Sequence, residues 1–227
     1  MKIKIIYFAY LFPDRWEPIV REQLDGIKRI GLYNECETIH MCVIAVNKEL
    51  NKLRELLSKE YTKVEIKYAF VDNVYEYPGL KLLYESAKEC CDNGDDEDDT
   101  VFLYLHTKGM TSGTADRDPH YTRRLMFKYT IENYKEYIDV FENNSRVDVG
   151  GVIPHKCGFI YFNFFWARAS YISTYCIEPK LTTNRYIWEI WIGTAYSKKE
   201  NIVTYSPILL FEKTEYNVWD IHDSLLL

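Results

Sequence analysis

The sequence predicts a single α/β domain with a mostly parallel central sheet flanked by helices. Short apolar stretches typical of buried strands alternate with longer stretches whose apolar residues recur at helical spacing. The order begins βαβαβ, for which sequential parallel strands with right-handed crossovers are the most economical topology. The chain has 227 residues, 47% hydrophobic and 27% charged. This composition excludes a wholly disordered or collagen-like protein.

The first half of the chain is predicted to alternate strands and helices regularly. Residues 2–9 alternate charge with isoleucine and then become continuously apolar, which predicts a strand buried inside a sheet. Apolar residues then recur at helical spacing from Ile19 to Ile30, and Gly31 is a natural stop. Further strands are predicted at residues 38–46, 64–71 and 100–105, and further helices at residues 50–61 and about 78–91.

The second half is predicted to continue the alternation without an internal repeat or linker. A helix should run from Pro119 to about Phe141, followed by a strand at 147–153 and an aromatic stretch at 159–171 that passes into a helix. A short helix at 186–191 and a strand at 202–210 complete the prediction. We therefore expect one domain over residues 1–227.

Two polar segments interrupt this pattern. Residues 92–99 carry six acids without regular ligand spacing, which favours a solvated loop over a cation site. Residues 110–120 are polar and contain glycine, as expected of a loop that closes over a ligand.

Charge and cysteine usage restrict the partners and the compartment. The formal charge is −6, from 28 Lys and Arg against 34 Asp and Glu, so the chain lacks the basic excess of a nucleic-acid binder. The six cysteines include no CxxC pair, which predicts reduced thiols and a cytoplasmic protein. No apolar stretch approaches the roughly 18 residues of a spanning helix, so no transmembrane segment is expected.

Polar residues directly follow the predicted strand at residues 100–105. Ligands bind open parallel sheets beyond the carboxyl ends of the strands, so His106, Thr107, Lys108 and Gly109 should emerge at a cleft. The Lys108 ammonium provides charge, while the Thr107 hydroxyl and the Gly109 amide donate hydrogen bonds, a set that suits a pyrophosphate. The alternative is a polar turn with no ligand.

Charged residues in the second half are further candidates. Arg123 and Arg124 either join Lys108 in a cationic cluster or form a solvated helix face. Glu189 lies among aromatic residues, where a carboxylate tends to have a raised pKa that suits a general base. The alternative role of Glu189 is an ion pair with Arg185, which stands at helical spacing from it.

Asn163 stands in an almost wholly apolar stretch, residues 159–167. A buried amide needs hydrogen-bond partners there, from the backbone or from a ligand hydroxyl. The sequence contains no GxGxxG, Walker A, GxSxG or HExxH motif, which argues against the common dehydrogenases, kinases, hydrolases and zinc proteases.

Taken in order, several stretches make the sequence resemble nucleotide-sugar-dependent glycosyltransferases of the GT-A type, in particular the capsid-glycosylating domains of large DNA viruses. These stretches are residues 16–24 with 31–33, 76–80, 103–109, 124–126, 163–171 and 185–193. They span nearly the whole chain, and the His-Thr-Lys-Gly strand end is the most specific. The resemblance implies a single GT-A-like, Rossmann-related domain, with a nucleotide-sugar-binding half at about 1–109 and an acceptor-binding half at about 110–227.

The resemblance also implies roles for individual residues. Glu189 would be the base of an inverting reaction, or would position the acceptor in a retaining one, and Lys108 would assist catalysis at the leaving diphosphate. The donor would be bound by Tyr7, Ala9, Tyr10, Asp72, Asn73, His106, Thr107, Lys108 and Arg124. The acceptor would be bound by Asn163, Trp166, Arg185 and Trp188.

The sequence departs from the family pattern at two places. Typical GT-A enzymes hold Mn²⁺ or Mg²⁺ with an Asp-x-Asp motif at the end of the fourth strand, where this chain has His106-Thr107-Lys108. Either His106 is a metal ligand with help from elsewhere, or Lys108 and an arginine replace the charge of the metal. The family also has glycine before the asparagine of its aromatic motif, and this chain has Phe162 there.

The sequence thus predicts an enzyme that transfers a hexose or deoxyhexose from a nucleotide diphosphate sugar, with UDP favoured, to a glycan or glycoprotein. The alternative is a catalytically degenerate module that binds glycans or scaffolds a glycosylation complex. Nucleotidyltransferases share the βαβ beginning, but they usually carry a glycine-rich loop after the first strand. Residues 10–15 contain no glycine, so this function is the least favoured.

Overall fold

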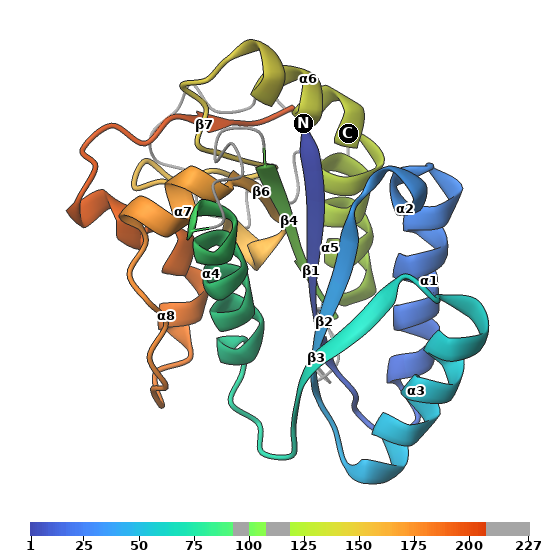
Figure 1. Cartoon of the computed structure of the whole chain (residues 1–227). Helices are drawn as coiled ribbons and strands as arrows, with labels where there is room; N and C mark the ends of the chain where they lie inside the picture. The colour runs from blue at the N-terminus through green and yellow to red at the C-terminus, as the bar shows by residue number, and fades with distance from the viewer. Residues whose placement is uncertain (93–99, 108–118, 208–227) are drawn as a thin grey trace.

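The computed structural model describes residues 1–92, 100–107 and 119–207, and it contains one seven-stranded sheet with helices on both faces (Figure 1). The strand order is β3-β2-β1-β4-β6-β5-β7, and β6 runs antiparallel to both of its neighbours. All other pairings are parallel. The strands are β1 (Lys2–Tyr10), β2 (Thr38–Ile44), β3 (Val64–Phe70), β4 (Thr100–His106), β5 (Val149–Gly151), β6 (Phe165–Arg168) and β7 (Thr204–Tyr205). The predicted fold class, a single α/β domain with a mostly parallel sheet, is confirmed.

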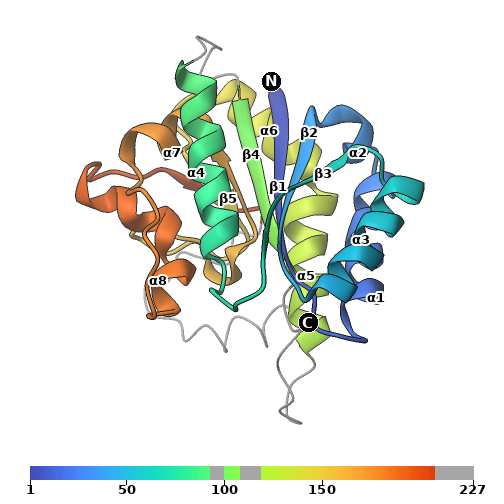
Figure 2. The same cartoon turned by 60° about the horizontal axis from the view of Figure 1, so that its bottom comes forward.

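The helices divide between the two faces of the sheet (Figures 1 and 2). One face carries α1 (Trp16–Arg29), α2 (Leu32–Glu35), α3 (Asn47–Glu60), α5 (Pro119–Met126) and α6 (Tyr134–Asn143). The other face carries α4 (Tyr77–Asp92), α7 (Ala169–Tyr175) and α8 (Tyr186–Glu189). Each layer has its own apolar core, because side chains alternate between the faces along each strand.

The aromatic stretch at 159–171 passes into α7 as predicted, but it also contains a strand that was not expected. A 3₁₀ turn at Tyr161–Asn163 leads into β6, which inserts antiparallel between β4 and β5. The pleat sends Phe165 into one core and Trp166 into the other. A strand buried on both faces has no polar alternation, so its sequence cannot be distinguished from a buried helix by periodicity.

Other predicted bounds also need correction. The helix expected from Pro119 to Phe141 is divided by a π-helical turn at Phe127–Glu132, and the strand expected at 147–153 is only three residues long. The late strand is limited to Thr204–Tyr205 within the described residues. The acidic run 93–99, residues 110–118 of the predicted loop, and residues 208–210 lie outside the described residues.

The connections reverse direction at β1. The chain moves outward from β1 to β2 and β3, then returns to place β4 on the opposite side of β1. Such a reversal opens a crevice beyond the carboxyl ends of the two strands, which is the usual ligand site in open α/β sheets. In the part of the chain that the structure describes, no helix is long and apolar enough to cross a membrane.

A hydrogen bond from Trp16 to the buried Glu49 joins α1 to α3 and makes stability depend on pH. The Trp16 indole N–H donates to Glu49 Oε2 at 2.6 Å, and Lys52 lies 3.1 Å from Glu49 Oε1. The hydrogen bond from Trp16, followed by the one from Lys52, holds the pKa of Glu49 below its ordinary 4.5. A depressed carboxyl pKa stabilises the fold above the unfolded pKa, and this stabilisation is lost as the pH falls through the folded value.

Trp16→Phe should therefore make the loss of stability on acidification shallower. The measurement is the urea midpoint as a function of pH below neutrality. Trp191→Phe is the matched control, because the Trp191 indole N–H donates to the Ile177 carbonyl at 2.8 Å, which does not titrate. It should lower the midpoint equally at every pH. Equal pH profiles for Trp16→Phe and the wild type would contradict this role of Glu49.

Candidate functional site

The ends of β1 and β4 are joined at the point where the connections reverse. The Tyr10 amide donates to Thr107 Oγ1 at 2.9 Å, and the Thr107 amide donates to the Phe8 carbonyl at 3.1 Å. Thr107 is 5% exposed. Its hydroxyl therefore satisfies a backbone donor at the end of β1 and fixes the floor of the expected crevice.

The backbone of His106 is hydrogen-bonded to a side chain of α1. Gln23 Nε2 donates to the His106 carbonyl at 3.1 Å, and Gln23 Oε1 accepts from the Tyr7 hydroxyl at 2.5 Å. Burial raises the pKa of Tyr7, so its hydroxyl remains a donor. This chain of contacts locks the backbone at the end of β4 to the first helix.

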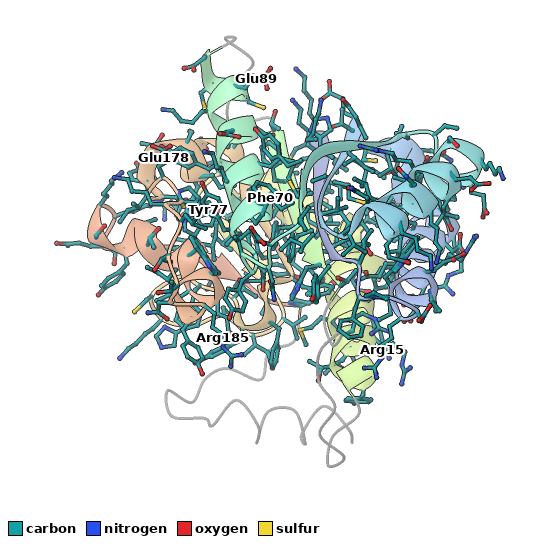
Figure 3. The ribbon with its side chains drawn as sticks, turned by 90° about the horizontal axis from the view of Figure 1, so that it is seen from below. Arg15, Phe70, Tyr77, Glu89, Glu178 and Arg185 are labelled. Atoms are coloured by element: carbon teal, nitrogen blue, oxygen red, sulfur yellow. The ribbon has the colours of Figure 1, made fainter. Side chains whose placement is uncertain are left out.

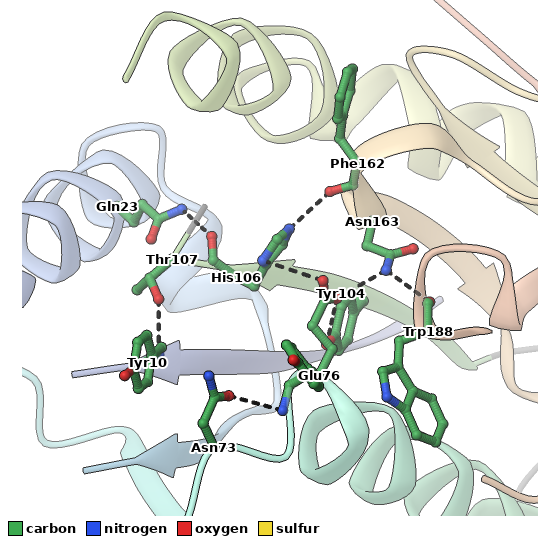
Figure 4. Close-up of polar contacts among 11 residues, drawn as sticks. Tyr10, Gln23, Asn73, Glu76, Tyr104, His106, Thr107, Phe162, Asn163 and Trp188 are labelled. Atoms are coloured by element: carbon green, nitrogen blue, oxygen red, sulfur yellow. Dashed lines mark hydrogen bonds and ion pairs between the residues drawn. The ribbon is translucent and has the colours of Figure 1, made fainter. Parts of the chain in front are cut away.

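The His106 ring joins a buried polar network on the other side (Figure 4). Its Nε2 lies 2.9 Å from the Phe162 carbonyl, and because a carbonyl oxygen only accepts, Nε2 must carry the hydrogen. Its Nδ1 lies 3.7 Å from Glu76 Oε1. Glu76 Oε2 accepts from the Tyr104 hydroxyl at 3.3 Å and from Asn163 Nδ2 at 2.9 Å. Glu76 is thus the centre of the network.

Asn163 links this network to α8. Its Nδ2 also donates to the Trp188 carbonyl at 2.9 Å, while its Oδ1 is buried without a hydrogen-bond partner among the described residues. The backbone here is strained, because Phe162 and Asn163 have φ of 69° and 51°. The glycine of the resembled family pattern would fit this left-handed conformation at Phe162 without strain.

The described residues do not fit a divalent metal at His106. Both ring nitrogens face protein oxygens, and Glu76 is the only acid paired with the ring in the described part of the chain. No group of three or more His, Cys, Asp or Glu side chains there could hold a metal ion.

The predicted donor-binding residues fall into different environments. Tyr7 and Ala9 are fully buried under α1, which corrects their assignment to the ligand edge. Their side chains point to the core because alternate residues of a strand share a face. Tyr10, His106 and Thr107 do lie at the strand ends. Asp72 and Asn73 are exposed and follow β3 after one intervening residue, Val71. Lys108 and Gly109 lie outside the described residues.

The two neighbouring arginines of α5 have different roles. Arg123 is 2% exposed and its Nη2 donates to Glu22 Oε2 on α1 at 2.7 Å. Arg124, the predicted donor ligand, is exposed on the same helix. Arg123 therefore anchors α5 to α1, whereas Lys108, the third member of the predicted cationic cluster, lies outside the described residues.

Three of the four predicted acceptor residues are buried. The Trp166 indole donates to the Thr130 carbonyl at 2.8 Å inside one core, so its assignment to the acceptor surface is corrected. Asn163 and Trp188 are 1% and 2% exposed. Only Arg185 is exposed, and its guanidinium lies 4.8 Å above the Tyr186 ring.

Glu189 is exposed at the end of α8. The apolar surroundings expected for this carboxylate are therefore absent, because the neighbouring Trp188 points inward while Glu189 points outward. Its role as a base stays a prediction. Figure 3 views the molecule from below and shows Arg185, at the start of α8, on the same side of the sheet as Tyr77.

Sequence reasoning missed Glu76 as a site residue. The available signal was the stretch Glu76-Tyr-Pro-Gly-Leu80 at the start of α4. Gly79 explains why α4 lies so close to the sheet, since a Cβ there would meet Phe8 Cβ at 2.7 Å and the Tyr104 hydroxyl at 2.8 Å. The glycine thus allows the close approach that brings Glu76 to Tyr104.

Gly79→Ala should lower the free energy of unfolding by about 1 to 3 kcal/mol, because an added methyl group must displace a packed core. It should also move Glu76 away from His106. Lys88→Ala, on the exposed face of the same helix, is the control and should change stability by less than about 0.5 kcal/mol. Chemical denaturation measures the free energy of unfolding of both variants. A Gly79→Ala variant as stable as the Lys88→Ala control would show that α4 can shift without a cost in stability.

Comparison with protein-family models and with curated protein sequences gives no match. Among solved structures, a 4-diphosphocytidyl-2C-methyl-D-erythritol synthase aligns with a TM-score of 0.43 and 8% identity, over 100% of this chain and 99% of that chain. The same enzyme from Anaerococcus prevotii gives 0.45 and 10%, over 99% and 96% of the two chains. A cytidylyltransferase from Leptospira borgpetersenii gives 0.46 and 12%, over 99% and 85%.

A likeness this weak does not discriminate between functions. The sheet order and the helices on both faces define the class of the chain, a single α/β domain with a mostly parallel seven-stranded sheet.

Proposed function

We propose that the chain is a glycosyltransferase that moves a sugar from a nucleotide diphosphate sugar, with UDP favoured, to a glycan or glycoprotein. The single observation that carries the proposal is the crevice at the carboxyl ends of β1 and β4, where the connections reverse. There, Tyr10 is hydrogen-bonded to Thr107, and the backbone of His106 is hydrogen-bonded to Gln23. The motif set of the GT-A glycosyltransferases supports it, because its most specific stretch ends at this point.

In this proposal the residues divide the work between donor and acceptor. Asp72 and Asn73 follow β3 and would bind the uridine or ribose, while Lys108 would stabilise charge on the leaving diphosphate. Glu189 would take the proton of the attacking hydroxyl in an inverting reaction. The Glu76 network would keep His106 and Asn163 fixed at the strand ends while the substrates bind.

A thermal-shift screen of UDP, GDP, TDP and CMP sugars, each with EDTA and with manganese, tests the proposal. A ligand at 100 times its dissociation constant stabilises the fold by about 2.7 kcal/mol. We expect a shift selective for one nucleotide, and its response to EDTA reports whether a metal takes part. A protein that neither binds nor hydrolyses any nucleotide sugar, with or without manganese, would refute the proposal.

A non-catalytic glycan-binding or scaffold module is the second candidate. It is favoured by the hydrogen bonds that engage Glu76 and His106 with other protein groups. Turnover that disappears in Lys108→Ala and in Glu189→Ala, with circular dichroism unchanged, would exclude it.

A further inference from the structure

The carboxylate of Glu76 uses only one of its two oxygens for hydrogen bonds within the described part of the protein. Glu76 Oε2 accepts from Asn163 Nδ2 at 2.9 Å and from the Tyr104 hydroxyl at 3.3 Å. Glu76 Oε1 accepts no hydrogen bond from the described residues, because His106 Nδ1, at 3.7 Å, is too far away for one. The Glu76 side chain is 16% exposed. Its second oxygen is therefore left for a donor from outside the protein.

The His106 ring does not supply this donor. Its Nε2 lies 2.9 Å from the Phe162 carbonyl and must carry a hydrogen. A neutral ring with its hydrogen on Nε2 has none on Nδ1, which is the atom that faces Glu76. The ring therefore lies beside Glu76 Oε1 without satisfying it.

Asn163 holds the carboxylate in this orientation. Its Nδ2 donates at 2.9 Å both to Glu76 Oε2 and to the Trp188 carbonyl, and since both partners only accept, the amide cannot be reversed. Asn163 Oδ1 is then buried without a partner among the described residues, on a backbone with φ of 51°. Both features cost free energy. Holding Glu76 through Oε2, so that Oε1 faces a ligand, would explain why they are kept.

The place and the chemistry of Glu76 Oε1 restrict the group that it can bind. It lies beside His106, the last residue of β4, at the carboxyl edge of the sheet where the crevice is expected (Figure 4). A carboxylate oxygen only accepts hydrogen bonds, so its ligand must donate one. The oxygens of a diphosphate are anionic acceptors, which a carboxylate repels. The hydroxyl groups of a sugar are donors without charge.

We propose that Glu76 Oε1 binds a hydroxyl group of a saccharide and that Asn163 positions the carboxylate for this contact. The inference rests on the proposed function and deepens it, because it assigns the sugar, and not the diphosphate, to the space beside Glu76. The sugar of the donor and that of the acceptor share this chemistry.

Calorimetric titration of the full chain compares UDP with UDP-glucose, GDP with GDP-mannose and TDP with TDP-glucose. Glu76→Gln should weaken binding of the nucleotide sugar by about tenfold, because a hydrogen bond to a charged acceptor is lost. Binding of the nucleotide diphosphate alone should stay within about twofold of the wild type. Asn163→Ala should also weaken only the nucleotide sugar. Glu89→Gln, which removes an exposed carboxylate from the same helix, is the matched control and should change neither affinity.

A second titration adds oligosaccharides to the protein saturated with the nucleotide diphosphate, and it distinguishes the acceptor from the donor. A loss of sugar affinity in Glu76→Gln, in either titration and without a loss of nucleotide diphosphate affinity, supports the subsite. Unchanged sugar affinities in both titrations would overturn it, and so would equal weakening of the sugars and the nucleotide diphosphate, which indicates a structural role only.

Failure of the proposed function gives a different result, in which the wild type binds neither a nucleotide diphosphate nor a nucleotide sugar. The oligosaccharides are then titrated alone. Oligosaccharide binding that Glu76→Gln weakens would still support the saccharide subsite, and the absence of such binding would overturn it.

Discussion

Glu189→Gln is expected to lower kcat by about 100- to 10,000-fold, the contribution typical of a general base, while leaving donor binding unchanged. Glutamine has nearly the shape of glutamate but cannot accept the proton of the attacking hydroxyl. Because Glu189 is exposed, the substitution should not disturb folding. The measurement is steady-state turnover with the donor identified in the thermal-shift screen, together with the shift that the donor produces.

The matched control is Glu178→Gln, another exposed glutamate on the same side of the sheet. It should change turnover by less than about twofold. A similarly small effect of Glu189→Gln would reject Glu189 as the base. Glu76 would then be the carboxylate to examine, because it lies at the strand ends beside His106.

Arg168→Ala is expected to destabilise the fold by about 3 to 5 kcal/mol, since it removes a buried cation and leaves several carbonyls unpaired. Arg168 is 3% exposed and donates to the carbonyls of Val147 at 2.8 Å, of Asn144 at 3.1 Å, and of Phe141. These carbonyls lie at and after the end of α6, so the guanidinium caps that helix and ties it to β6.

The melting temperature should fall by roughly 2 to 4 °C for each kcal/mol lost in a chain of this size. Arg146→Ala is the matched control, because Arg146 is exposed two residues after Asn144, and it should have little effect. An Arg168→Ala variant that melts with the wild type would mean that water replaces the guanidinium at all of these carbonyls.

The hydrophobic pattern along the sequence was sufficient to predict the strands and most helices in the first half of the fold. The strands β1 to β4 and the helices α1, α3 and α4 lie within three residues of their predicted bounds, whereas the short helix α2 was not predicted. Each predicted element has a continuous apolar stretch or a clear helical period. The second half was predicted less well. There, β6 is buried on both faces, and the helix after Pro119 changes its hydrogen-bond register at Phe127–Glu132. Neither feature leaves a distinct periodic signal.

The residues of the candidate site were also predicted only in part from the sequence. The sequence placed His106 and Thr107 at a strand end, because chain order fixes which residues follow a strand. It did not identify Glu76, which is 30 residues earlier in the chain and reaches His106 only because Gly79 lets α4 approach β1 and β4. It also chose Trp166 and Trp188 for the acceptor surface, whereas the structure buries both side chains.

By itself, the sequence determined the fold class and the polar composition of the strand ends, since both follow from period and order along the chain. The tertiary structure decided which side chains face the same space. It placed Arg123 in an ion pair with α1, sent Trp166 into a core and turned Glu189 outward. The physical reason is that facing directions depend on the pleat of β6 and on the approach of helices, which arise from packing between segments distant in sequence.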